Sequence, residues 1–244
     1  MRSCRHGLCC QMCRRRPTSD KKPTGKKQLM TFGTMLSTMS EGMVRTLGIF
    51  ILTLIFSLPL GMVVALLRKS RFGFIRGFIS AYISIMRGTP LMLQLLVWYF
   101  GPFYLFGWNI GNWRFPALII GFVVNYAAYF AEIYRGGIES IPVGQYEAAE
   151  VLGYTKTQTF MRIILPQVIK IIMPSVTNEV ITLVKDTSLA FTLAYAEVFS
   201  LAKQISASQS SFMPFLIAGV FYFVANYAVE FLMVRIEKSM DYYK

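Results

Sequence analysis

The chain has 244 residues, of which 55% are hydrophobic and 15% are charged, and its formal net charge is +13. This composition is typical of an integral membrane protein rather than of a soluble domain. The basic excess does not indicate nucleic-acid binding, because the first 28 residues hold +8 of the charge and the remaining +5 is spread over predicted loops.

The first 30 residues form a basic tail that precedes the predicted membrane domain, residues 31–244. The tail contains the only histidine, His6, and all four cysteines of the chain, Cys4, Cys9, Cys10 and Cys13. Their spacing matches no recognised zinc module, so we expect no metal site and a tail that is either disordered or the product of a misassigned start. Met30 and Met35 are alternative starts.

Hydropathy predicts an all-α integral membrane fold of about five transmembrane helices. A membrane-crossing helix needs roughly 20 apolar residues. The predicted spans are 44–67, one within 79–104, 115–134, 168–195 and 213–234. Five spans place the two chain ends on opposite sides of the membrane.

Lys and Arg residues indicate which loops face the cytoplasm. They gather after the first span, between the third and fourth spans, and at the C-terminus. The opposite loops, 105–114 and 196–212, contain only Arg114 and Lys203, and the aromatic residues nearby suit the outer interface. The segment between the third and fourth spans is therefore predicted to face the cytoplasm.

The third span has polar side chains at intervals of four and three residues, at Asn125, Tyr129 and Glu132. This stripe lines a substrate cavity, with Gln94 contributing from the second span, or else makes helix-packing contacts. For Glu132 the simpler interpretation is an ion pair with Arg135, three residues along the same helix.

Residues 139–166, hereafter the knob, form a polar segment between two apolar runs. Pro142 suits the first helical position and Gly153 a position of positive φ, so a short helix is predicted over about 142–152. Thr155 and Gln158 have the spacing of a capping box that opens a second helix. Pro166 is expected to interrupt this second helix.

The first knob helix has a small apolar face made by Ala148, Ala149 and Leu152, which would let another protein approach closely. Glu147 and Glu150 keep it soluble. An ordinary surface loop is the alternative.

The fourth span contains the densest set of polar residues. At 100° per residue, five of them share an arc of about 120°, and polar groups inside a membrane often mark a pathway. They are Asn178, Glu179, Thr182, Lys185 and Asp186. We expect Glu179 to meet an ammonium group and Lys185 a carboxylate, with Thr187 and Ser188 helping to orient the ligand. Alternatively, Lys185 and Asp186 pair with each other or with neighbouring helices.

The chain has no Gly-x-x-x-x-Gly-Lys-Ser/Thr loop, no dinucleotide fingerprint and no His-Glu-x-x-His helix. We therefore expect no ATP hydrolysis, no cofactor and no catalytic residue in this chain. A transporter driven by an ion gradient is the main alternative, with the charges of the fourth span as its coupling site, although no internal repeat supports it.

Three motifs resemble those of ABC importer membrane subunits from the polar amino-acid uptake family. They are Glu147-Ala148-Ala149 followed by Gly153 and Ile163-Ile164-Leu165-Pro166, Arg87-Gly88-Thr89-Pro90, and Lys185-Asp186-Thr187-Ser188-Leu189. The resemblance covers roughly residues 40–240. It implies a type I ABC importer-like fold in the bacterial cytoplasmic membrane, and a permease that moves a polar amino acid. The negative charge of Glu179 itself favours a cationic one.

The same resemblance implies the partners of the chain. They are a second permease subunit, an external amino-acid-binding protein and cytosolic ATPase subunits that bind ATP and Mg. It also implies that residues 136–166 are the coupling loop. The ATPase would bind at a coupling helix made of Tyr146, Glu147, Ala148, Ala149, Leu152 and Gly153.

Overall fold

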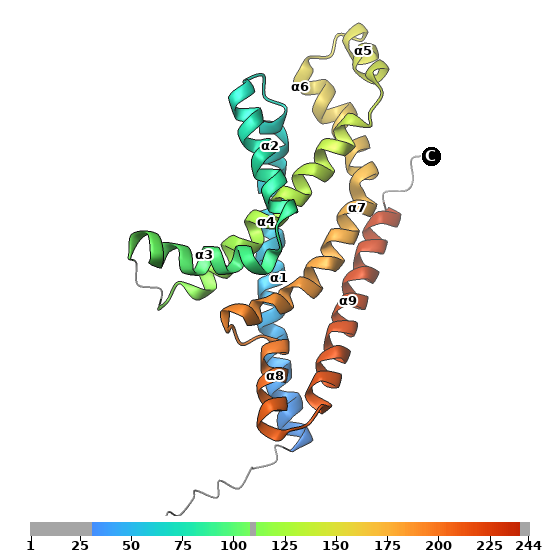
Figure 1. Cartoon of the computed structure of the whole chain (residues 1–244). Helices are drawn as coiled ribbons and strands as arrows, with labels where there is room; N and C mark the ends of the chain where they lie inside the picture. Colours follow the sequence, from blue (N-terminus) through green and yellow to red (C-terminus); the bar gives the residue numbers. More distant parts are fainter. Residues whose placement is uncertain (1–30, 108–110, 240–244) are drawn as a thin grey trace, which may run out of the picture.

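The computed structural model describes residues 31–107 and 111–239, and the regular elements in these ranges are helices (Figure 1). The tail predicted for residues 1–30, with its cysteines and His6, lies outside the described residues. The α-helices are α1 (Phe32–Arg68), α2 (Gly73–Gly88), α3 (Leu91–Phe106), α4 (Arg114–Glu139), α5 (Val143–Val151), α6 (Lys156–Thr159), α7 (Leu165–Asp186), α8 (Val198–Gln209) and α9 (Met213–Ser239).

Four helical segments are long and apolar enough to cross a membrane: α1, α4, the run Lys156–Leu193 that includes α6 and α7, and α9. A fifth is the pair α2 and α3, which meets the same criterion but is bent by 112°. Within the described residues, this agrees with the prediction of about five spans. The all-α membrane fold is confirmed, and the many exposed apolar side chains of α1 and α9 suit contact with lipid.

The span predicted within residues 79–104 is divided into two helices. Thr89, which precedes Pro90, has the extended dihedrals φ −118° and ψ 147°. A residue before proline disfavours the helical region, and proline has no N–H to continue the hydrogen bonding of α2. The apolar run on both sides of Pro90 conceals this change of direction, because hydropathy carries no information about angle.

Helix α1 begins at Phe32, twelve residues before the predicted start at residue 44. Its first turns contain Ser and Glu residues, so they lower the local hydropathy. Met35 and Met39 are nevertheless buried in a small cluster with Val198 and Ala202 of α8 and Ala218 of α9. Packing against α8 and α9 therefore contributes to the stability of this part of the helix.

The core of the bundle is formed by α4, which packs against α1, α3 and α7. Two glycines permit the closest approaches. A Cβ atom at Gly61 of α1 would lie 2.8 Å from the Phe130 Cβ atom, and one at Gly137 of α4 would lie 2.2 Å from Cγ2 of Ile172. The small residues thus set how closely α4 sits against its neighbours.

The sequence predicts that Pro166 interrupts the second knob helix, but in the structure the helix continues past this residue. A five-residue π-helical segment, Phe160–Ile164, joins α6 to α7, and Pro166 lies in the first turn of α7. The local change to wider hydrogen bonding lets the helix pass a residue that lacks an N–H. The run Lys156–Leu193 is consequently continuous.

The loop predicted at 196–212 contains a helix, α8. Its N-cap residue Glu197 is fully buried, and the Glu197 carboxylate accepts hydrogen bonds from the backbone N–H groups of Phe199 and Ser200, each over 2.6 Å. The Tyr222 hydroxyl donates a third bond over 2.9 Å. Burial raises the pKa of this carboxyl above its ordinary value, and the three hydrogen bonds oppose that change.

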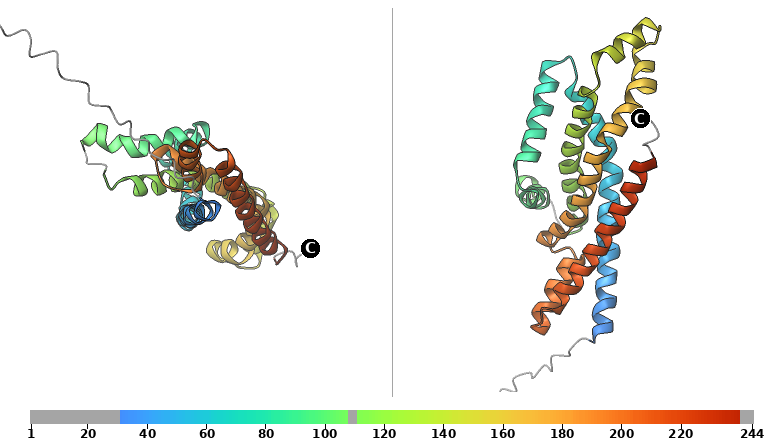
Figure 2. Two further views of the ribbon diagram at one scale, coloured as in Figure 1. Left: turned by 90° about the horizontal axis from the view of Figure 1, so that it is seen from below. Right: turned by 90° about the vertical axis from the view of Figure 1, so that its right-hand side faces the viewer.

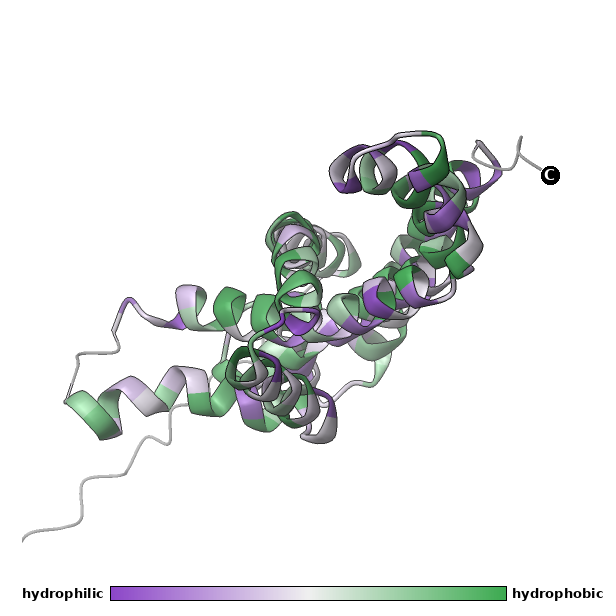
Figure 3. Ribbon diagram, turned by 90° about the horizontal axis from the view of Figure 1, so that it is seen from above, coloured by the Kyte–Doolittle hydropathy of each residue, from purple (hydrophilic) through white to green (hydrophobic). Residues whose placement is uncertain are grey.

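The basic connections gather at one end of the molecule. Figure 1 shows the α1–α2 connection, α5 and α6 at the top and α8 at the bottom, and the second view in Figure 2 agrees. Seen from the knob end in Figure 3, the helices are largely hydrophobic, with hydrophilic residues concentrated in short stretches. This arrangement matches the loop grouping from which the cytoplasmic side was predicted.

Candidate functional site

The knob joins α4 to the long helical run that contains α7. Helix α4 ends at Glu139, and the chain then turns through Ser140 and Ile141 into α5. Pro142 is the N-cap of α5 rather than its first helical residue, with φ −58° and ψ 139°. This moves the predicted start by one residue and leaves the predicted helix in place.

The end of α5 has the predicted glycine geometry. Gly153 has φ +78°, its N–H donates to the Glu150 carbonyl over 2.9 Å, and the Tyr154 N–H donates to the Ala149 carbonyl over 3.0 Å. These two bonds form a Schellman motif, in which a left-handed residue ends the helix and satisfies its last carbonyl groups. A glycine adopts this conformation without the strain that a Cβ atom would add.

The second knob helix opens with the predicted capping box. The Thr155 hydroxyl accepts from the Gln158 N–H, and the Gln158 side chain accepts from the Thr155 N–H over 3.0 Å. Two N–H groups at the start of α6 are thereby satisfied. Capping at both sides of Gly153 gives the knob a defined turn.

The two faces of α5 differ in exposure. Ala149 is only 1% exposed and packs inside the knob, so its side chain does not belong to an outward docking face. Glu147 and Val151, one helical turn apart, lie on the opposite face, and Val151 is 88% exposed. Leu152, at the end of the helix, is 73% exposed.

Sequence reasoning missed Val151. The available signal was an apolar pair, Val151 and Leu152, placed where an otherwise polar helix ends. Of the predicted coupling residues, Tyr146, Glu147 and Ala148 are also exposed, and Gly153 shapes the turn.

The polar residues of α7 share one face, as the helical spacing predicts. The buried residues of the helix, among them Val180 and Leu183, lie on the other face. Asn178 and Lys185 are exposed, whereas Glu179, Thr182 and Asp186 are partly buried. One side of α7 therefore carries both signs of charge.

Helix α4 meets this polar face. The Tyr126 hydroxyl on α4 donates to the Asp186 carboxylate over 2.8 Å. Arg87, near the end of α2, lies 5.5 Å above the ring of Tyr129, which is on the same helix as Tyr126. The hydrogen-bond donor to Asp186 thus comes from another helix, and no Lys185–Asp186 ion pair occurs among the described residues.

Two further predicted pathway residues make local bonds. The Thr187 hydroxyl is buried and donates to the Val184 carbonyl over 2.6 Å, and the Thr182 hydroxyl donates to the Asn178 carbonyl over 2.9 Å. Thr187 begins a 3-10 segment, Thr187–Leu193, that continues α7, and Ser188 is partly buried beside it. These bonds favour a structural role for Thr187.

Gln94 and Asn125 meet at the break between α2 and α3. The Asn125 amide donates to the Gln94 side-chain oxygen over 2.9 Å, and both amides donate to the Met86 carbonyl. The Gln94 amide also donates to Thr89. Both side chains are buried, and their bonds satisfy groups that the end of α2 leaves free, which favours the packing alternative.

Glu132 forms the predicted ion pair with Arg135 on its own helix, and it also pairs with Arg68 at the end of α1. Arg135 binds Glu139 as well. These pairs join α1 to α4 at the end of the molecule that bears the knob. The sequence contained the pair within α4 but no sign of the pair between helices.

The family model described as the binding-protein-dependent transport system inner membrane component matches residues 57–242. The chain belongs to this family. The L-cystine transport system permease protein of Bacillus subtilis (strain 168) is 36% identical over 208 residues, which are 84% of this chain and 87% of the relative. The putative glutamine permease of Rickettsia bellii (strain RML369-C) is 35% identical over 213 residues, 87% and 97% of the two chains.

A solved amino acid ABC transporter "with histidines" has the same fold. Its TM-score is 0.77 at 32% identity, and the alignment covers 86% of this permease and 99% of the other chain. This chain is therefore an inner-membrane permease subunit of an amino-acid ABC importer. It is a transport subunit and not itself an enzyme.

Proposed function

We propose that α5 is the coupling helix of the permease and docks on a separate cytosolic ATPase. The observation that carries this proposal is the exposed apolar end of α5, Val151 and Leu152, on a knob braced internally by Ala149. An exposed apolar surface rimmed by polar residues is typical of a protein contact. Glu147 lies one turn from Val151 and completes the proposed face.

The proposed assembly contains two permease subunits, an external amino-acid-binding protein and ATPase subunits that hold ATP and Mg. Closure of the ATPases would move the knobs, and the helical run Lys156–Leu193 would transmit that movement to the membrane domain. The family description, a component of a binding-protein-dependent system, supports an external binding protein.

The polar face of α7 is the proposed path of a polar amino acid. Glu179 and Asp186 would meet the ammonium group or a cationic side chain, and Lys185 would meet the carboxylate. Asn178, Thr182 and Ser188 would orient the ligand. In this proposal Gln94, Asn125 and Thr187 hold the helices that form the path. The partial burial of both carboxylates supports a role for them, since charges at membrane depth are retained for function.

The coupling proposal is tested by ATPase capture. Val151→Asp places a charge on the proposed docking face, so the purified permease should lose its copurifying ATPase while inserting normally. Phe212→Asp is the matched control, because Phe212 is also an exposed apolar residue but precedes α9 at the other end of the molecule. Unchanged ATPase capture by Val151→Asp would disprove the docking face.

The pathway proposal is tested by binding of radiolabelled amino acids to the purified importer. Glu179→Gln should weaken binding of arginine more than binding of glutamine, because only the cation loses an opposite charge. Glu237→Gln, near the end of α9, removes an equal charge that is not on the polar face of α7. Equal losses for both amino acids would contradict a charge-selective role of Glu179.

A further inference from the structure

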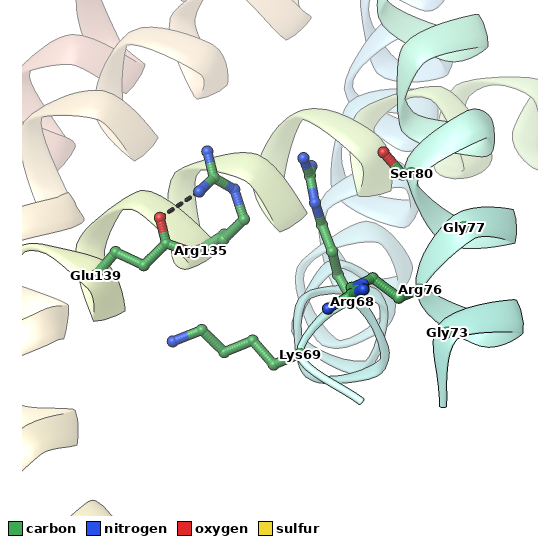
Figure 4. A pocket seen from close by; sticks show the side chains of 8 residues that line it. All are labelled: Arg68, Lys69, Gly73, Arg76, Gly77, Ser80, Arg135 and Glu139. Carbon is green, nitrogen blue, oxygen red and sulfur yellow. Dashed lines mark hydrogen bonds and ion pairs between the residues drawn. The ribbon is translucent and has the colours of Figure 1, made fainter. Parts of the chain in front are cut away.

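A cavity of about 460 Å³ lies between the ends of α1, α2 and α4, at the end of the molecule that bears the knob (Figure 4). Its lining residues are Arg68, Lys69, Gly73, Arg76, Gly77, Ser80, Arg135 and Glu139. Figure 4 shows Arg68 and Arg135 extending into the space between the helices, with Lys69 below them. None of these side chains belongs to the proposed docking face or to the polar face of α7.

The cavity is strongly basic. Four cationic side chains line it. Two carboxylates contact them, Glu139 in the lining and the neighbouring Glu132. Four positive charges minus two negative charges leave a net charge of +2. Arg68 and Arg135 are bound by these carboxylates. Among the described residues, Lys69 and Arg76 have no acidic partner, so they are available to an anion.

One wall of the cavity is bare backbone. Gly73 and Gly77 lie one turn apart on α2, and a Cβ atom at either position would meet nothing within 4 Å. Gly73 is the first residue of α2, and no described side chain caps this helix end. A phosphate group could therefore approach the backbone N–H groups, which the helix dipole favours, as well as the cationic side chains.

Exposed aromatic side chains lie next to the residues that line the cavity. Phe74 is 87% exposed and Phe78 67% exposed, and both lie on α2 beside the glycines of the wall. In a membrane-spanning helix such side chains suit contact with acyl chains. Basic pockets between helices on the cytoplasmic side suit the head groups of anionic lipids.

We propose that this cavity binds the phosphate group of an anionic phospholipid from the leaflet on the knob side. Lys69 and Arg76 supply the unpaired charge, the glycine wall supplies room, and Ser80 supplies a hydroxyl donor. The bound phosphate would hold the ends of α1, α2 and α4 together. Since α4 leads directly into α5, membrane composition would influence the position of the knob.

The first experiment counts bound lipid. The full-length permease with its copurifying subunits is reconstituted in nanodiscs of phosphatidylglycerol and phosphatidylcholine, extracted, and examined by native mass spectrometry. The wild type should retain phosphatidylglycerol selectively. The double variant Lys69→Gln/Arg76→Gln should bind it about 30-fold more weakly, because each cation near the surface contributes about a factor of five.

Two controls separate this site from general charge effects. Arg71→Gln/Lys238→Gln removes the same charge outside the cavity and should retain the lipid. Gly77→Leu fills the cavity without removing charge and should lose the lipid, whereas Ala81→Leu, one turn later and outside the cavity, should not. Equal lipid loss in both charge variants, or lipid retained by Gly77→Leu, would overturn the proposal.

The second experiment identifies the source of the phosphate. Inorganic phosphate is titrated against the purified assembly in neutral detergent while its thermal midpoint is followed. A midpoint that rises with phosphatidylglycerol but not with inorganic phosphate supports the lipid. If the midpoint rises with inorganic phosphate but not with phosphatidylglycerol, and this rise is absent in Lys69→Gln/Arg76→Gln, the cavity is an anion site for a soluble anion and the lipid proposal is overturned. No rise with either overturns the site.

Discussion

Tyr126 on α4 donates a hydrogen bond to Asp186 at the end of α7, and this bond joins α4, the most buried of the four long spans described, to the polar face of α7. Tyr126 belongs to the core, while Asp186 belongs to the set of residues proposed to meet substrate. The orientation of the carboxylate therefore depends on packing around α4. A change in the core around Tyr126 should therefore affect the position of the Asp186 carboxylate.

Tyr126→Phe should lower the thermal midpoint of the purified permease and weaken amino-acid binding. It leaves the partly buried carboxylate without its donor, a loss of about 1 to 3 kcal/mol. Tyr129→Phe is the matched control, since no hydroxyl bond of Tyr129 occurs among the described residues. If both variants melt at the wild-type temperature, the bond contributes little to the folded state.

Gly61→Ala should destabilise the contact between α1 and α4. The added Cβ atom would lie 2.8 Å from the Phe130 Cβ atom and 3.2 Å from the Ala127 carbonyl oxygen, so the backbones have to separate. Overpacking of this kind costs about 1 to 3 kcal/mol. Gly48→Ala on the same helix meets nothing within 4 Å and should melt at or above the wild-type temperature, since alanine favours helix. A Gly61→Ala variant as stable as Gly48→Ala would contradict the close approach.

Gly153→Ala should loosen the end of α5, because an alanine at φ +78° is strained by about 1 to 2 kcal/mol. Hydrogen exchange of the α5 amides should become faster, and transport should fall relative to ATP turnover. Gly144→Ala lies inside α5 in open space and should slow exchange, since alanine favours helix. The idea fails if the two alanines change exchange in the same direction.

Glu197 should make the stability of the α8 region depend on pH. Because burial raises the pKa of this carboxyl in the folded state, its favourable contribution is present below the ordinary value of 4.5 and is lost as the pH rises through the raised value. The midpoint of the wild type, measured against that of Glu197→Gln, should therefore fall as the pH increases from 4.5. A difference that grows in the opposite direction would show that the hydrogen bonds outweigh burial.

Local signals in the sequence predicted local structure well. Gly153 and the Thr155–Gln158 capping box depend on residues within one turn, and both have the expected geometry. The Pro166 prediction was wrong because proline chemistry does not reveal whether a π-helical segment will accommodate it. Helix α8 was missed because its cap is a glutamate, which the usual N-cap rules do not favour.

The relations between helices could not be read from the sequence. Gln94 and Asn125 are 31 residues apart and meet only because Pro90 turns the chain. The cavity at Lys69 and Arg76 requires three helix ends to converge. The spacing of α7 predicted its polar face, because one helix defines it, whereas the hydrogen bond from Tyr126 to that face depends on tertiary packing.

In the coupling proposal, the helical run from Lys156 to Leu193 would act as a lever. Glu179 lies about 35 Å along it from the Lys156 end, so each degree of tilt about one end displaces the other by about 0.6 Å. In this proposal, a tilt of a few degrees at the ATPase end would move the Glu179 carboxylate by a distance comparable to a bond length. The displacement of Glu179 per degree of tilt depends on helix length. Inserting residues between α6 and α7 would therefore change this displacement and would also rotate the Glu179 side chain to a different face of the bundle.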